Sequence, residues 1–197
     1  MIAGRLSKDA VIAYHSALQF LGKAHSVSSR LTYVTARRLK PFEFQGTQFV
    51  AVLAPSSIRA LPDFGGGVRS ELRNGMYIRL TNHERTLVDV LDVPAYGGGW
   101  EEIWRSLESV EFFDLDFVVD YALRLGHALT IARVGFFLEQ HHQSLMTEER
   151  HLAALQVHIP KQRQYFQSGQ RKGGKLVHRW NLIVPKDVLE RSWEEVA

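Results

Sequence analysis

The hydrophobic pattern of this 197-residue chain changes its period near residue 81. Before that point, short runs rich in β-branched and aromatic residues are separated by glycine-containing turns, as at 30–35, 42–44, 47–53 and 76–80. Such runs are typical of strands and hairpins. After that point, apolar residues recur every three or four positions, as they do along one face of a helix. The pattern predicts an α+β fold with a small, mostly antiparallel sheet near the N-terminus, followed by a helical half and a C-terminal strand region.

Local signals predict where individual elements begin and end. Apolar residues at helical spacing followed by Gly22 predict an amphipathic helix over 8–21. Thr81 and Glu84 fit a capping box at the start of a helix that ends before Pro94. Further helices are expected over 100–107, from a cap at Asp114 or Asp116 to Gly126, over the strongly apolar stretch 129–139, and from 147 onward, with a last strand over 176–184.

Length and composition favour one soluble domain. At roughly 150 residues per domain, residues 1–197 are expected to form a single domain, with a sheet-rich part at about 10–80, a helical part at about 81–158 and a basic tail at about 159–197. The chain contains no cysteine, which excludes disulfides, thiolate zinc sites and cysteine nucleophiles. No apolar run approaches the ~20 residues of a membrane span, and residues 1–9 do not resemble a secretory signal. We therefore expect a cytoplasmic protein without membrane association.

Charge is distributed unevenly along the chain. Residues 1–80 carry 11 Lys and Arg against 4 Asp and Glu, residues 81–160 carry 5 against 13, and residues 161–197 carry 8 against 4. Two basic ends therefore flank an acidic middle. This asymmetry fits a polyanionic partner such as DNA, because Lys and Arg that face phosphates release counterions. It fits equally well an acidic middle that neutralises the basic ends within the fold.

Two basic clusters are the candidate nucleic-acid contacts. Aromatic residues and glutamines stand among the cations of the second cluster, as is common on surfaces that follow a phosphate backbone. Solvated surface loops are the alternative interpretation. The candidate phosphate contacts are Arg37, Arg38 and Lys40 in the first cluster, and Lys161, Arg163, Arg171, Lys172 and Lys175 in the second.

No catalytic motif is complete. The glycine triplets do not fit a phosphate-binding loop, no G-x-S-x-G is present, and the histidines at 141, 142, 151 and 158 lack metal-ligand spacing. Asp63 and Glu71 could belong to a metal-dependent nuclease, but Arg73 stands where such a core has a lysine, and arginine cannot lose its proton to activate water. The sequence predicts no catalytic residue, no metal and no cofactor. A nuclease-like domain and a protein-interaction module that uses the acidic middle remain the alternatives.

Several short motifs occur in an order found in a known family. They are Tyr14-His15-Ser16-Ala17-Leu18, Tyr33-Val34-Thr35, Glu84 to Asp89, Pro94, Gly97 to Glu102, Tyr121-Ala122, Gly126 and Ala132 to Glu139. From about residue 10 to residue 190, the chain resembles the C-terminal domain of AbiEi-type antitoxins of type IV toxin–antitoxin systems. The resemblance implies a small mixed α/β domain without catalytic activity. It also implies repression of the antitoxin's own operon and neutralisation of a nucleotidyltransferase-like toxin without a stable complex.

The chain departs from the family in one respect that bears on function. Family members usually carry a winged helix-turn-helix, which reads the operator, ahead of this domain. About seven residues precede the first predicted helix here, so we expect this module to be missing and sequence-specific reading with it. The motif from Glu84 to Asp89 is expected to be a capped core helix in which Arg85 or Asp89 pairs with another element.

Overall fold

The structure is a computed structural model that describes residues 7–73, 75–167, 169 and 173–193. The chain divides into two compact units, Met1–Phe113 and Asp114–Ala197. The predicted α+β class is confirmed, with a sheet near the N-terminus and helices after it. The boundary between the units lies within the stretch that was predicted as one helical part.

The first unit is built on a mixed sheet. In the described residues its strands follow the order β3-β4-β2-β1-β6-β5. Three neighbouring pairs are antiparallel, whereas β1 with β6 and β2 with β4 run parallel. The strands are β1 (Val11–Ile12), β2 (Arg30–Thr35), β3 (Phe42–Phe44), β4 (Thr47–Leu53), β5 (Val68–Arg73) and β6 (Met76–Thr81).

The predicted helix over 8–21 is wrong in its first half. Val11 and Ile12 form strand β1 between β2 and β6, and helix α1 covers only His15–Phe20. Both residues of β1 are buried, and the strand has a hydrogen-bonded partner on either side. Pairing with distant strands therefore outweighs the local helical spacing. Tyr14, which joins strand to helix, has φ 59° and ψ −142°, a conformation that residues other than glycine rarely adopt.

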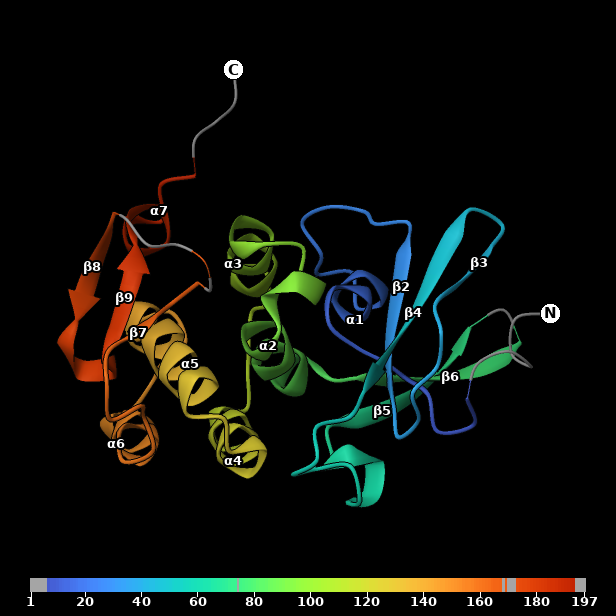
Figure 1. Cartoon of the computed structure of the whole chain (residues 1–197), viewed down its shortest axis with the longest axis horizontal. Helices are drawn as coiled ribbons and strands as arrows, with labels where there is room; N and C mark the ends of the chain where they lie inside the picture. Colours follow the sequence, from blue (N-terminus) through green and yellow to red (C-terminus); the bar gives the residue numbers. More distant parts are fainter. Residues whose placement is uncertain (1–6, 74, 168, 170–172, 194–197) are drawn as a thin grey trace. The chain divides into compact units, whose positions relative to one another are not determined.

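Two longer helices complete the first unit, α2 (His83–Asp92) and α3 (Trp100–Glu108), together with the short 3-10 helices η1 (Pro62–Phe64) and η2 (Pro94–Tyr96). The predicted capping box of Thr81 and Glu84 is wrong, because Asn82 caps α2 by accepting a hydrogen bond from the Arg85 amide, while its own N–H donates to the Gly67 carbonyl. Thr81 stays in β6, where its hydroxyl lies 2.6 Å from that of Thr86. Figure 1 shows α1 between strand β2 and the helices α2 and α3.

The second unit combines three longer helices with a small sheet of order β7-β9-β8. Asp114 caps α4 by accepting from the Phe117 amide, and Gly126 ends that helix in the left-handed region, as predicted. The elements are α4 (Leu115–Leu125), α5 (Ala128–Gln140), α6 (Glu149–Gln156), β7 (Gln164–Tyr165), β8 (Gly174–Val177), η3 (His178–Trp180), β9 (Leu182–Pro185) and α7 (Lys186–Glu190).

The centre of the second unit lies along α5, whose residues from Thr130 to Leu138 are all buried. Trp180 packs onto this helix, and a Cβ at Gly135 would lie 2.1 Å from its Cζ3 atom. Trp180 also donates a hydrogen bond from Nε1 to Glu139 at 2.6 Å. Gly135 and Glu139 are four residues apart and therefore share one face of α5. The indole thus needs glycine at one position and a carboxylate at the other.

The single strand predicted over 176–184 is wrong. The chain turns back through η3, and β8 and β9 pair as an antiparallel hairpin. Asn181 closes the turn with φ 51°. Burial of Trp180 against α5 supplies the physical reason, because the tryptophan must leave the strand direction to reach the helix.

Among the described residues, every helix is too short or too polar to span a membrane.

Candidate functional site

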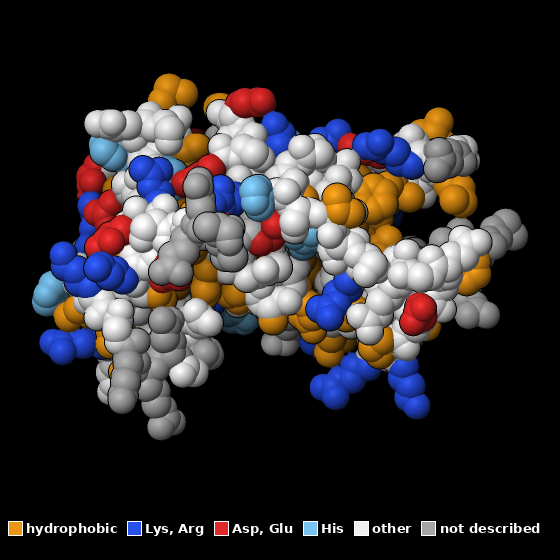
Figure 2. All heavy atoms as spheres, turned by 90° about the horizontal axis from the view of Figure 1, so that it is seen from above, with side chains coloured by type: hydrophobic (Ala, Val, Ile, Leu, Met, Phe, Trp, Pro, Cys, Tyr) orange, Lys and Arg blue, Asp and Glu red, His pale blue; other side chains and the backbone are white. Residues whose placement is uncertain are grey.

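The first basic cluster lies in the connection between β2 and β3. Arg37, Arg38 and Lys40 are all exposed. Among the described residues, none of the three has an ion-pair partner, so their charges are directed to solvent. Figure 2 shows Lys and Arg side chains on the surface of one face of the molecule.

The second basic cluster belongs to the second unit. Lys161 and Arg163 are exposed just before β7, and Lys175 is exposed on β8. These strands flank β9 on its two sides. The other two predicted contacts, Arg171 and Lys172, lie outside the described residues. The first basic cluster belongs to the first unit and the second basic cluster to the second unit. A continuous basic surface formed by both clusters stays a prediction.

The carboxylates of the nuclease alternative are held apart by different arginines. Glu71 pairs with Arg69 and Arg73, and Asp63 pairs with Arg79. In the β5–β6 ladder Ser70 is opposite Arg79, which places Arg79 and Glu71 on opposite faces of the hairpin. The two carboxylates therefore do not converge on a common metal position.

Acidic residues and histidines of the second unit have local structural roles. Asp114 caps α4, and Asp116 pairs with Arg150 and His151. The ring of His141 is buried, with Nδ1 2.8 Å from the Phe137 carbonyl oxygen. Within the described residues, no three His, Asp or Glu side chains are grouped so that they could hold a metal ion.

Arg85 on α2 forms an ion pair and hydrogen bonds from a buried position. The sequence predicted that Arg85 or Asp89 of this helix would pair with another element. The Arg85 Nε lies 3.3 Å from Asp89 one turn further along α2. Its Nη1 donates to the carbonyl oxygens of Asp63 and Gly66, both at 2.7 Å. The guanidinium thereby ties the segment around η1 to α2, and its side chain is only 1% exposed.

Glu102 and His15 form a second buried pair, between α3 and α1, with 3.1 Å between His15 Nε2 and Glu102 Oε1. The same carboxylate oxygen accepts from the amides of His25 and Ser26 and from the Ser106 hydroxyl, at 2.8–3.2 Å. Burial raises the pKa of Glu102, but hydrogen bonds from Ser26 and Ser106 and the charge of His15 outweigh it and lower the pKa below its ordinary value. Glu102 is therefore an ionised anchor for the segment after α1.

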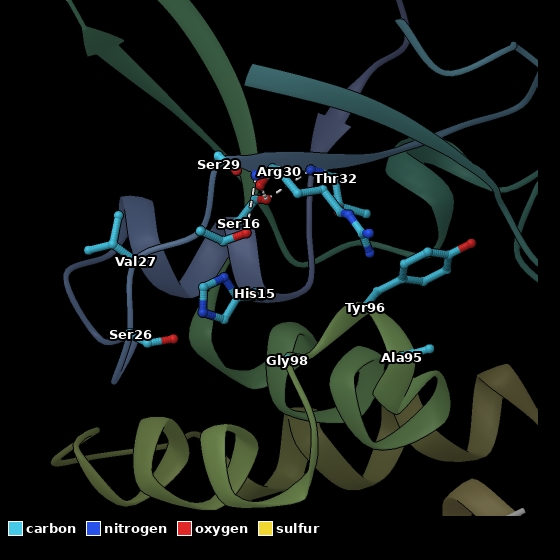
Figure 3. A pocket seen from close by; sticks show the side chains of 11 residues that line it. His15, Ser16, Ser26, Val27, Ser29, Arg30, Thr32, Ala95, Tyr96 and Gly98 are labelled. Atoms are coloured by element: carbon cyan, nitrogen blue, oxygen red, sulfur yellow. Dashed lines mark hydrogen bonds between the residues drawn. The ribbon is translucent and has the colours of Figure 1, made fainter. Parts of the chain in front are cut away.

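A pocket of about 350 Å³ opens beside this anchor (Figure 3). Its walls come from α1 (His15 and Ser16), from the segment 26–30 with Thr32, and from η2 and the turn after it (Ala95, Tyr96 and Gly98). Tyr96 also packs against Tyr14, with ring centroids 5.2 Å apart. Ser16 donates to the Arg30 carbonyl and accepts from the Thr32 amide, which fixes α1 to β2 at the pocket wall.

Sequence reasoning did not find this pocket. Its lining comes from three segments that meet only in the fold. The available local signal was the run from Ser26 to Arg30, which holds three serines followed by an arginine.

The fold of the chain has a counterpart among solved structures. The chain is similar to the RV2827C protein from Mycobacterium tuberculosis, with a TM-score of 0.57 and 17% sequence identity. The match covers 95% of this chain but 66% of the RV2827C chain, so this chain spans just under two thirds of the length of that protein. At this identity the likeness establishes a shared fold. No protein-family model and no curated protein matches the chain.

Proposed function

We propose that this chain is the antitoxin component of a type IV toxin–antitoxin system of the AbiEi type. In this role it neutralises a nucleotidyltransferase-like toxin without forming a stable complex with it. It also acts as a DNA-associated regulator of its own operon, in the cytoplasm and without catalysis.

The observation that carries this proposal is the way the family motifs meet in the first unit. Tyr14 and His15 come from the first motif, the arginine–aspartate pair from the motif at 84–89, and Glu102 from the motif at 97–102. His15 pairs with Glu102, and Arg85 pairs with Asp89 within a helix that packs against α1. Motifs whose contacting residues lie up to 87 positions apart thus supply buried polar contacts of one unit. This supports treating them as a single family signature.

DNA association is proposed for the two basic clusters. Exposed lysines and arginines that contact phosphates give salt-dependent affinity with little dependence on sequence. The test measures binding to a duplex at several salt concentrations for the wild type and for Arg37→Glu/Arg38→Glu/Lys40→Glu. We expect weaker binding and a shallower salt dependence in the variant. Equal affinity and an equal salt dependence of the wild type and the variant would contradict DNA association.

Antitoxicity is tested separately, by co-expressing the chain with the product of the adjacent gene and following growth. Relief of growth arrest supports the proposal. Hydrolysis of a nucleic acid by the purified chain, lost in Asp63→Asn, would support the nuclease alternative instead. Co-purification of the neighbouring protein in stable complex would favour the interaction module.

A further inference from the structure

We propose that the pocket beside the His15–Glu102 pair binds a small molecule through a terminal phosphate group, such as a mononucleotide. This inference goes beyond the antitoxin proposal and does not depend on it.

The pocket presents hydrogen-bond donors that the fold leaves available. Ser28 Oγ accepts from the Arg30 amide at 3.1 Å, so its own O–H can donate elsewhere. The Arg30 Nε is held by Gln48 at 3.3 Å, which orients the guanidinium and leaves its two terminal amino groups to bind. Within the part of the chain that the structure describes, the Ser29 hydroxyl has no hydrogen bond. Ser28, Ser29 and Arg30 all line the pocket, so its wall offers two hydroxyls and a guanidinium.

This donor set fits a phosphate better than a cation or a neutral ligand. A guanidinium matches the oxygens of a phosphate, and hydrogen bonds to an ionised group are the stronger ones. The lining includes no Asp or Glu. The nearest carboxylate described above, that of Glu102, is occupied by four donors from His15, His25, Ser26 and Ser106. Its Oε1 is engaged by these donors within the fold, and Glu102 is not among the residues that line the pocket.

The remaining walls suit an organic body attached to that phosphate. Ligand pockets commonly hold about 300–1,000 Å³, and this one holds about 350 Å³. Tyr96 contributes an aromatic side chain to the wall, and Figure 3 shows the Arg30 side chain reaching toward it across the pocket. The uncommon backbone conformation of Tyr14 directs the next residue, His15, to the pocket wall. Backbone strain of this kind is concentrated at functional positions.

The experiment is calorimetric titration of the purified chain with AMP, with adenosine and with inorganic phosphate. We expect saturable binding of AMP with one site per chain, weaker binding of inorganic phosphate in competition with it, and no saturable binding of adenosine. Arg30→Gln should weaken AMP binding about tenfold or more, as expected for loss of a charged hydrogen-bonding group. The matched control Arg105→Gln removes an equal charge from α3 outside the pocket and should leave the affinity unchanged.

Each outcome decides the proposal. Saturable binding of inorganic phosphate alone, lost in Arg30→Gln, would support the phosphate site and identify free phosphate as its source. Absence of saturable binding for both AMP and phosphate, or equal losses in Arg30→Gln and Arg105→Gln, would overturn it. Arg37→Glu/Arg38→Glu/Lys40→Glu should bind AMP as the wild type does, so a failure here is distinguishable from a failure of DNA association.

Discussion

Glu102 on α3 lies 3.1 Å from His15 on α1, and this buried pair joins two helices whose contacting residues are 87 positions apart in the sequence. The carboxylate also holds the backbone of the segment after α1, so one side chain fixes two residues of the pocket wall, His15 and Ser26. Several of the measurable properties of the first unit follow from this arrangement.

Replacing Glu102 with Gln is expected to destabilise the first unit by about 1–3 kcal/mol, because four donors lose their ionised acceptor. The neighbouring substitution Glu101→Gln is the control. Glu101 is exposed and pairs only one turn away with Arg105, so its loss should cost about 0.5 kcal/mol or less. Urea unfolding of the three proteins measures both effects, and equal midpoints for the two variants would contradict the anchoring role.

The contribution of Glu102 should disappear in acid. Its pKa in the folded state lies below the ordinary value of 4.5. The unfolded state therefore binds more protons, and stability falls with decreasing pH. The stabilisation by Glu102 is complete above pH 4.5 and is lost as the pH falls through the pKa that Glu102 has in the folded state. The difference in unfolding free energy between wild type and Glu102→Gln should shrink as the pH is lowered below 4.5. A difference that stays constant or grows in acid would show that Glu102 is not held ionised by its donors.

Replacing Gly135 with Ala is expected to destabilise the second unit, although alanine is the better helix former. The added Cβ would lie 2.1 Å from Trp180, and overpacking a core commonly costs about 1–3 kcal/mol. Thermal unfolding followed by tryptophan fluorescence measures the change. Trp180→Leu removes the indole that the new Cβ would meet. Gly135→Ala should therefore lower the transition temperature less in the Trp180→Leu background than in the wild-type background. An unchanged or raised transition temperature in Gly135→Ala alone would contradict the contact.

Arg85→Met should destabilise the first unit by about 3 kcal/mol or more, as expected when one partner of a buried ion pair is removed. The loss includes the donors to the carbonyls of Asp63 and Gly66. Arg79→Met removes a guanidinium that pairs with the exposed Asp63 carboxylate and should cost about 1 kcal/mol or less. Urea midpoints decide the comparison. Equal losses of unfolding free energy in Arg85→Met and Arg79→Met would contradict a larger stabilisation by the buried Arg85.

The features that could be predicted from the sequence are those fixed by neighbouring residues. The Asp114 cap, the Gly126 stop and the hairpin between β3 and β4 depend on contacts within a few positions. The fold class followed from the change in hydrophobic period, which reflects the same local preferences.

The features that could not be predicted depend on distant partners. Val11 and Ile12 form a strand only because Leu80 and the residues of β2 lie beside them. The turn at Asn181 forms because Trp180 packs on α5. The pocket needs α1, the serine segment and η2 together, and no single segment carries its pattern.

The measurement that tests the central claim most directly is a growth assay in which the chain is co-expressed with the product of the adjacent gene, the proposed toxin. We predict that growth arrest is relieved and that the toxin does not co-purify with the chain. A toxin inactivated by substitution controls for the burden of expression. Persistent arrest in cells that accumulate the folded chain would contradict the antitoxin assignment.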